Sequence, residues 1–263
     1  MAKQQSADEI FTGIRRFREM LKAGETIIAT AVTFNDPLVS DALADSVDLL
    51  WYDLEHTQKD PATLNAHLAI ARGRGKGTVV RVGDVHPSVI KPVLDAGADG
   101  IIAAQIRTVA EVEELTSNCK YPPIGRRGAG PRVPSNYGRI GMDYYAAANE
   151  NIFTSVMIET VEALEAIDDI VRVPNLDSVV IGPFDLSGAL GDLGNMESPA
   201  IQEGFDRIIA SAHSAGIYVG CGMGGDSQFA RSMATRGVDW IQVGSDFSHM
   251  LQCMDELVAE IKA

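Results

Sequence analysis

Apolar strand-like runs and helical segments alternate along almost the whole of this 263-residue chain. One clear unit has an apolar run over residues 152–158, a helical segment over about 161–171 and a second apolar run over 177–181. A strand–helix–strand unit of about thirty residues is the size of one parallel β/α repeat. The alternation therefore predicts a parallel sheet with a helix between successive strands.

The same pattern predicts eight strands, over residues 26–34, 47–55, 78–82, 100–105, 152–158, 177–181, 217–221 and 239–243. Eight such repeats in about 250 residues predict an α/β fold, a closed (β/α)8 TIM barrel formed by one domain over residues 1–263. An open doubly wound sheet is the alternative, but it favours an early GxGxxG turn, and none follows the first expected strand. Additional helices are expected over 8–23, before the barrel, and over 245–262, after it.

Composition narrows the possible partners and compartment. The net charge of −14 argues against nucleic acid, which calls for a basic patch. No apolar run approaches the length of a membrane span, and the polar N-terminal stretch does not look like a signal peptide. Three cysteines without metal-type spacing favour a reducing compartment. We therefore expect a soluble cytoplasmic protein.

Active sites of TIM barrels lie at the carboxyl ends of the strands, so polar residues at those ends are the candidates. The expected strands carry or deliver Asp53, Glu55, His56, Arg81, Gln105, Glu159 and Asp185 there. Glu159 and Asp185 follow neighbouring strands, where two carboxylates can share a hard divalent cation through oxygen. For each carboxylate alone, capping of the following helix is the alternative. For Arg81 the alternative is an internal ion pair with Asp53 or Glu55, because interior charges must be paired.

The positions of the lysines bear on any carbonyl chemistry. None of them lies within an expected strand: Lys3, Lys22, Lys59, Lys76, Lys91, Lys120 and Lys262. A Schiff-base aldolase needs a desolvated lysine inside the barrel. Carbonyl chemistry in this chain is therefore expected to depend on a metal.

Five motifs occur in one order: DLEH at 53–56, VR at 80–81, YPPIGRRG at 121–128, IET at 158–160 and IGPFDLS at 181–187. Together they resemble the HpcH/HpaI aldolase family of metal-dependent 2-oxo-acid aldolases, over residues 25–262 or so. That family includes 4-hydroxy-2-oxoheptanedioate aldolase and 2-dehydro-3-deoxyglucarate aldolase. The resemblance implies a (β/α)8 barrel and a homo-oligomer, commonly a hexamer built from dimers that exchange the last helix.

The resemblance also implies roles for individual residues. Glu159 and Asp185 would hold Mg²⁺, Mn²⁺ or Co²⁺, and Arg81 would contact the 2-oxo group. His56, paired with Asp95, would assist proton transfer, and Asp53 is counted with these catalytic residues. The expected substrate-binding residues are Arg81, Gln105, Gly182, Pro183, Phe184 and Asp185.

The pocket departs from the family at Met157 and at Gln105. Many members carry Gln two residues before the metal-binding Glu, where this chain has Met157. Many members have an apolar residue at the end of the fourth strand, where this chain has Gln105. We expect that the amide has moved across the pocket, which affects the substrate more than the chemistry.

The expected function is a metal-dependent, class II aldolase, a carbon–carbon lyase. It would reversibly cleave a 4-hydroxy-2-oxo acid to pyruvate and an aldehyde through a metal-stabilised enolate. One alternative is a CoA-thioester lyase of the citramalyl- or malyl-CoA type, with rim contacts from Arg126, Arg127, Arg132 and Arg139. The other is a non-catalytic barrel that binds a small 2-oxo acid.

Overall fold

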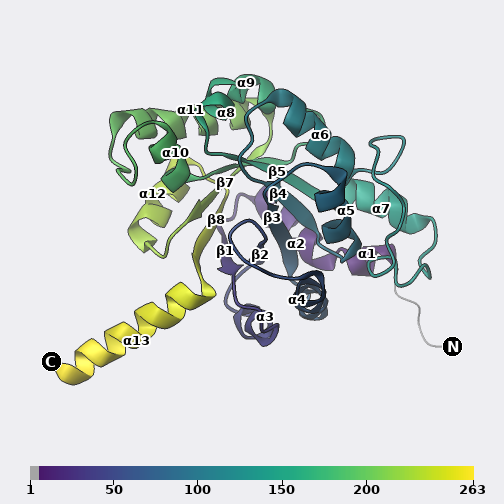
Figure 1. Ribbon diagram of the computed structural model, residues 1–263, viewed down its shortest axis with the longest axis horizontal. Helices are drawn as coiled ribbons and strands as arrows, with labels where there is room; N and C mark the ends of the chain where they lie inside the picture. Colours follow the sequence, from purple (N-terminus) through teal and green to yellow (C-terminus); the bar gives the residue numbers. More distant parts are fainter. Residues whose placement is uncertain (1–5) are drawn as a thin grey trace.

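Eight parallel strands close into a barrel in the computed structural model, which describes residues 6–263 (Figure 1). Each strand is hydrogen-bonded to the next in sequence, and β8 pairs with β1. The strands are β1 Ile27–Val32, β2 Leu49–Asp53, β3 Gly77–Val82, β4 Gly100–Ala103, β5 Phe153–Ile158, β6 Ser178–Ile181, β7 Tyr218–Met223 and β8 Trp240–Ser245. This confirms the predicted TIM-barrel fold and its strand order.

Helices follow or flank every strand of the barrel. They are α1 Ala7–Ile10, α2 Thr12–Ala23, α3 Leu38–Leu43, α4 Pro61–Gly73, α5 Pro87–Asp95, α6 Val109–Cys119, α7 Asp143–Asn151, α8 Val161–Glu165, α9 Ile167–Ile170, α10 Pro183–Ala189, α11 Pro199–Ala215, α12 Ser227–Arg236 and α13 Asp246–Lys262. Across residues 6–263, no helix combines the length and the apolar character that crossing a membrane requires.

Two helices predicted as continuous are each broken once. The segment 8–23 breaks at Phe11 into α1 and α2, and the segment 161–171 breaks at Ala166 into α8 and α9. Both residues have φ near −90° and ψ near 10°, outside the α-helical range (−95° and 16°, −89° and 7°). The first break lets Phe11 stack on Tyr144, with ring centroids 6.0 Å apart.

The amino-terminal end of the barrel is sealed by α2. Phe17 on this helix packs edge-on against Phe153 and Trp240, the first residues of β5 and β8, at centroid distances of 5.2 and 6.0 Å. Gly13 allows the close approach, because a Cβ there would lie 2.3 Å from the backbone of Lys76. With this end filled by aromatic rings, access to the barrel is left to the carboxyl end.

Helix α13 does not pack back on its own barrel. Figure 1 shows it projecting away from the body of the molecule, at the yellow end of the chain. It exposes a row of large apolar side chains, Phe247, Met250, Leu251, Met254, Leu257 and Ile261. A groove of about 320 Å³ on the barrel is lined by Thr26 and by residues of β1, α12 and β8, the strand that precedes α13. We call it the β8–β1 groove.

Candidate active site

Arg81, near the carboxyl end of β3, is held by two acidic side chains from the end of the neighbouring β2 and the loop after it, Asp53 and Glu55. The parallel pairing of these strands sets Arg81 opposite Asp53. The guanidinium donates to Asp53 from Nε at 3.0 Å and from Nη2 at 2.6 Å, and its Nη1 lies 3.2 Å from Glu55 Oε2. The indole ring of Trp51 lies under the guanidinium, 5.8 Å from its carbon. Arg81 therefore forms the internal ion pairs that were expected as the alternative, and the same pairs orient it as a candidate site residue.

The surroundings of Asp53, Glu55 and Arg81 shift the pKa of each side chain. Burial raises the pKa of Asp53, but the hydrogen bonds and charge of Arg81 lower it further, so it falls below the ordinary value. Burial raises the pKa of Glu55, with the positive charges of Arg81 and His56 opposing the shift. Burial lowers the pKa of Arg81, but Asp53 and Glu55 raise it above the usual range. Arg81 is therefore a permanent, oriented cation.

Glu159 is a buried carboxylate directly after β5. It is 2% exposed, and its Oε1 accepts from the backbone N–H and the Nε2 of Gln105, at 2.7 and 3.0 Å. Gln105 reaches this position with φ at +55°, a left-handed conformation that turns its backbone N–H toward Glu159. Burial raises the pKa of Glu159, Gln105 opposes the shift, and the negative charges of Glu55 and Asp185 add to it. A nearby positive charge would stabilise the ionised form.

Asp185 lies in the first turn of α10, which begins at Pro183. Proline favours this start, because its ring fixes φ and the first helical N–H has no intrahelical partner. Asp185 and Glu159 line a common cavity of about 480 Å³ together with Gln105 and Arg107. Asp185 also lines a second cavity of about 220 Å³, whose walls include Arg81 and Met157. We call the second one the arginine cavity.

Gly182 makes this close arrangement possible. A Cβ at this position would lie 2.7 Å from Glu159 Oε2 and 3.0 Å from the Met157 methyl carbon. Met157 in turn places its sulfur 3.9 Å from Arg81 Nη1. The position where relatives of the resembled family often carry Gln therefore does face the site, beside the arginine.

The structure does not bring His56 and Asp95 together. His56 has 64% of its side chain exposed, and its Nε2 lies 3.6 Å from Glu55. Asp95 instead pairs with Arg127 at 2.8 Å. Arg127 belongs to the irregular segment after α6, and its buried guanidinium stacks 4.5 Å from the centre of the Tyr121 ring. Within residues 6–263, the expected pair is thus replaced by Glu55–His56 and Asp95–Arg127 contacts.

Two further residues of the arginine cavity were not singled out from the sequence. Gln242 and Met223, from β8 and β7, line it opposite Arg81. A polar residue inside the apolar run 239–243 was the available signal for Gln242. Lys59 is also buried, and burial lowers its pKa, but it lines a separate cavity and donates to the Thr33 carbonyl. It therefore does not supply a Schiff-base lysine at this site.

The carboxylates that line these cavities determine which kind of metal ion could bind there. Among residues 6–263, no group of three or more His, Cys, Asp or Glu side chains is placed to enclose a metal ion. Glu159, Glu162 and Asp185 line one cavity, but Glu162 is paired with Arg107, which leaves Glu159 and Asp185 as the carboxylates available to a cation. Burial raises the pKa of Glu159, and the negative charges of Glu55 and Asp185 add to the shift. Such an arrangement fits a hard cation that takes only one or two protein carboxylates and completes its shell with water and substrate oxygens.

These features define a TIM-barrel protein whose carboxyl-end cavities combine an oriented arginine with buried carboxylates. The chain belongs to the HpcH/HpaI aldolase/citrate lyase family, whose sequence profile matches residues 31–253.

Similar proteins span almost the entire chain. It is 34% identical to a hydroxypyruvate/pyruvate aldolase of Rhizorhabdus wittichii, over 95% of this chain and 100% of that protein. It is 30% identical to a 5-keto-4-deoxy-D-glucarate aldolase of Shigella dysenteriae, over 94% of this chain and 96% of that protein. Among solved structures, an HpcH/HpaI aldolase/citrate lyase family protein from Burkholderia cenocepacia superposes with a TM-score of 0.89 at 26% identity, covering 95% and 99% of the two chains.

Proposed function

We propose that this protein is a class II aldolase that reversibly cleaves a 4-hydroxy-2-oxo acid to pyruvate and an aldehyde. One observation carries the proposal: the arginine cavity joins a cation locked in place by Asp53 and Glu55 to the carboxylate of Asp185, beside the buried Glu159. The aldolase names of the relatives support the same reaction class.

In the cleavage direction, the C4 hydroxyl loses its proton and the bond between C3 and C4 breaks. The electron pair of that bond forms an enolate, and C3 then takes up a proton to become the methyl group of pyruvate. Negative charge therefore develops on the 2-oxo oxygen. A fixed donor aimed at the place where charge develops is worth more than a mobile one, because it need not reorganise during the reaction. We assign this role to Arg81.

Glu159 and Asp185 are the residues that would hold a divalent cation, Mg²⁺, Mn²⁺ or Co²⁺. When bound, such a cation supplies Lewis-acid polarisation of the 2-oxo acid. Gln105 would position Glu159 through its two hydrogen bonds, in the manner of the outer partners that orient metal ligands. Pro183 has no N–H and Gly182 donates to the Ile158 carbonyl at 3.3 Å, so the N–H groups of the first turn of α10 from Phe184 onward are the expected partners of the substrate carboxylate.

His56 is the proposed proton acceptor for the C4 hydroxyl group. It lies in the loop directly after β2, and its contact with Glu55 links it to the group that holds Arg81. In this chain Glu55, rather than Asp95, is positioned to orient the imidazole. A histidine suits the task because its ordinary pKa lies near neutral pH.

The CoA-thioester alternative receives less support from the rim arginines. Arg126 is paired with Glu114 and donates to Asn118, and the Arg127 guanidinium is buried against Asp95. Two of the four arginines expected to meet a CoA phosphate are therefore already engaged.

We further propose that the protein forms a homo-oligomer in which subunits exchange α13, with a hexamer as the expected assembly. The exposed apolar row of α13 and the β8–β1 groove have the complementary character that such an exchange needs. An amphipathic helix with an exposed apolar face gains stability when another subunit covers that face.

We also propose a cytoplasmic location, because all three cysteines are free thiols, as expected in a reducing compartment.

The proposed reaction is tested by pyruvate release from 4-hydroxy-2-oxo acids, coupled to lactate dehydrogenase. We expect turnover that a chelator abolishes and that Mn²⁺ or Mg²⁺ restores. Binding of a 2-oxo acid with no pyruvate release under any metal would favour the non-catalytic barrel. Turnover that persists after exhaustive chelation would contradict the metal-dependent class.

A further inference from the structure

A larger cavity of about 530 Å³ adjoins the arginine cavity on the side of β7. The two share Pro183, Phe184 and residues 222–224 in their walls, so they adjoin at the carboxyl end of the barrel. The outer part lies between the loop before α11 and the start of α12. We call it the β7 side pocket.

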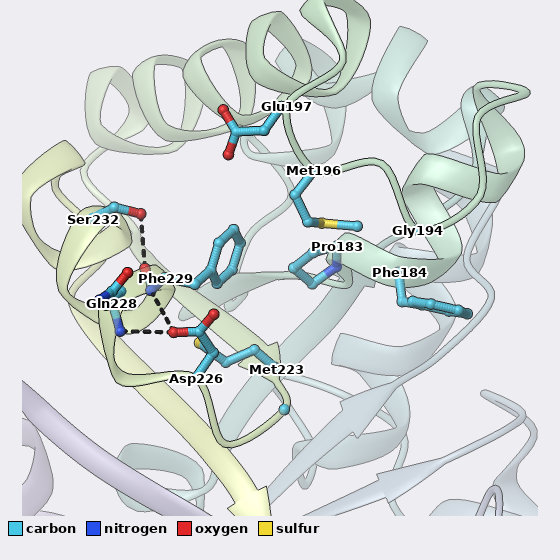
Figure 2. A pocket seen from close by; sticks show the side chains of 12 residues that line it. Pro183, Phe184, Gly194, Met196, Glu197, Met223, Asp226, Gln228, Phe229 and Ser232 are labelled. Atoms are coloured by element: carbon cyan, nitrogen blue, oxygen red, sulfur yellow. Dashed lines mark hydrogen bonds between the residues drawn. The ribbon is translucent and has the colours of Figure 1, made fainter.

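The β7 side pocket has an apolar centre. Figure 2 shows the ring of Phe229, the side chain of Met196 and the ring of Pro183 converging on it, with Phe184 turned away. These residues come from α12, the loop before α11 and the start of α10. A ligand group filling this centre would bury apolar surface, which favours an apolar or aromatic substituent.

The polar groups at the rim are acidic. Glu197 stands on one side of the pocket and Asp226 on the other (Figure 2). Asp226 is committed to capping α12, accepting from the N–H groups of Gln228 and Phe229 at 2.8 and 3.1 Å. Glu197 is exposed and its backbone, not its carboxylate, is hydrogen-bonded, to Asn195. No Lys or Arg is among the residues that line this pocket in the described chain.

We propose that the β7 side pocket binds the aldehyde part of the substrate, and that it selects uncharged aldehydes with an apolar or aromatic group over aldehydes that carry a carboxylate. This inference rests on the proposed aldolase function and adds the class of its acceptor. The pyruvate part would occupy the arginine cavity, so that the aldehyde carbon lies where the two cavities join. A carboxylate placed in the side pocket would meet Glu197 with no cation to neutralise either charge.

A second cavity that contains an arginine is the alternative site for the aldehyde, and it would favour an aldehyde that carries a carboxylate. Arg107 lines the cavity shared by Glu159 and Asp185, on the β5 side. Its guanidinium is already paired with Glu162 at 2.8 Å, and both side chains are more than half exposed. An arginine that is already paired is a weak anion receptor, because Glu162 neutralises its charge and competes with the incoming carboxylate. The β7 side is therefore the favoured direction for the aldehyde.

The test compares three aldehydes that share one ring: benzaldehyde, 4-carboxybenzaldehyde and the methyl ester of the latter. In the addition direction, pyruvate C3 loses a proton and bonds to the aldehyde carbon, and the aldehyde oxygen takes up a proton. We expect kcat/KM for benzaldehyde and for the ester to exceed that for the carboxylate by roughly tenfold or more, as like-charge contact should require. The ester is larger than the carboxylate, so size cannot produce this order.

Charge reversal at one residue makes the test specific. Glu197→Arg should raise kcat/KM for 4-carboxybenzaldehyde by roughly tenfold relative to the ester, and Glu197→Gln should give a smaller shift in the same direction. Glu203→Arg is the matched control, since Glu203 is exposed on α11 and does not line the pocket. An equal effect of the two arginines, or a wild-type preference for the carboxylate, would overturn the proposal. Loss of activity toward the carboxylate in Arg107→Gln alone would assign the acceptor to the β5 side instead.

Exchange of the pyruvate methyl protons in D2O separates this inference from the function on which it rests. Exchange reports enolate formation without any aldehyde. Metal-dependent exchange with no preference among the three aldehydes would refute only the acceptor assignment. Absence of exchange, together with absence of turnover, would refute the aldolase function itself.

Discussion

Arg81 and Asp53 form a two-point contact, with Nε donating to Oδ1 at 3.0 Å and Nη2 donating to Oδ2 at 2.6 Å. The contact is built by the pairing of β2 with β3, which sets the two residues opposite each other. Because the guanidinium is planar, two parallel hydrogen bonds fix the plane of the whole group. The remaining nitrogen, Nη1, lies 3.2 Å from Glu55 Oε2, and the guanidinium lines the arginine cavity.

Arg81→Lys should not preserve activity, because a single ammonium cannot reproduce this planar fork. We expect kcat to fall by about 10²-fold or more, as for loss of one oriented donor to a developing oxyanion. Arg172→Lys is the control, since Arg172 is exposed and paired with Asp169, outside the residues that line the arginine cavity. Steady-state kinetics on one substrate decide the point, and a change confined to KM would indicate ground-state binding alone.

The paired change Glu159→Gln and Asp185→Asn should abolish metal-dependent turnover and Mn²⁺ binding, with the fold intact. Both substitutions keep the size of the side chain and remove the negative charge that a hard cation requires. Calorimetric titration with Mn²⁺, turnover and circular dichroism are measured together, with Glu165→Gln on the exposed side of α8 as control. Unchanged activity in the double variant would end the metal assignment.

Gln105→Met should weaken Mn²⁺ binding by roughly tenfold, because it removes one of the two donors that orient Glu159. The backbone N–H of residue 105 would still donate, so binding should not be lost. Methionine has an unbranched chain of similar length, which leaves the left-handed backbone at this position no more strained than before. The titration is repeated with Gln105→Glu, whose extra charge beside Glu159 should be more damaging than the loss of the amide.

Met157→Gln should recover part of the activity lost in Gln105→Met. A glutamine at 157 would place an amide beside Arg81 and Gly182, where the thioether now lies. A double-mutant cycle on kcat/KM measures the coupling, since residues that share a contact are non-additive. Strict additivity would show that the amide has not moved across the pocket.

A homo-oligomer should sediment as the main species at micromolar concentration, and Met250→Asp with Met254→Asp should dissociate it. Burying one methionine contributes about 1.5–3 kcal/mol, so two charges on the apolar row of α13 should outweigh the gain from exchange. Glu260→Gln is the control at an exposed polar position of the same helix. A wild-type protein of monomer mass alone would contradict the proposed exchange.

The stability of the fold should depend on pH through Asp99. Burial raises the pKa of Asp99 to about 7, against the hydrogen bonds that its carboxylate accepts from Thr78. Because the folded pKa lies above the unfolded value of about 3.9, the contribution is present at low pH and is lost as pH rises through about 7. Between pH 6 and pH 8 we expect the free energy of unfolding of the wild type to fall by about 1 kcal/mol relative to Asp99→Asn. Urea unfolding at both pH values provides the measurement, and equal changes in both proteins would refute the assignment.

Local sequence pattern was sufficient for the barrel and for the order of its strands, whose ends lie within two residues of the expected ones. Alternation of apolar runs with helical segments is a local property that predicts a parallel sheet, and eight repeats without an early GxGxxG turn favour the closed barrel over an open sheet. The same alternation placed Arg81, Glu159 and Asp185 at one end of the barrel. Their side chains do line adjoining cavities there, because carboxyl ends of parallel strands meet at one rim.

Tertiary structure alone decided which charges meet and where two helices go. Asp95 pairs with Arg127 because the segment after α6 folds back with its guanidinium buried, a contact between residues 32 apart that no local pattern encodes. The break at Phe11 places its ring against Tyr144, far along the chain. The sequence showed that the last helix is amphipathic, but not that it projects away from its own barrel (Figure 1). Periodicity specifies which face of an element is apolar, whereas the partner of that face depends on how distant segments pack.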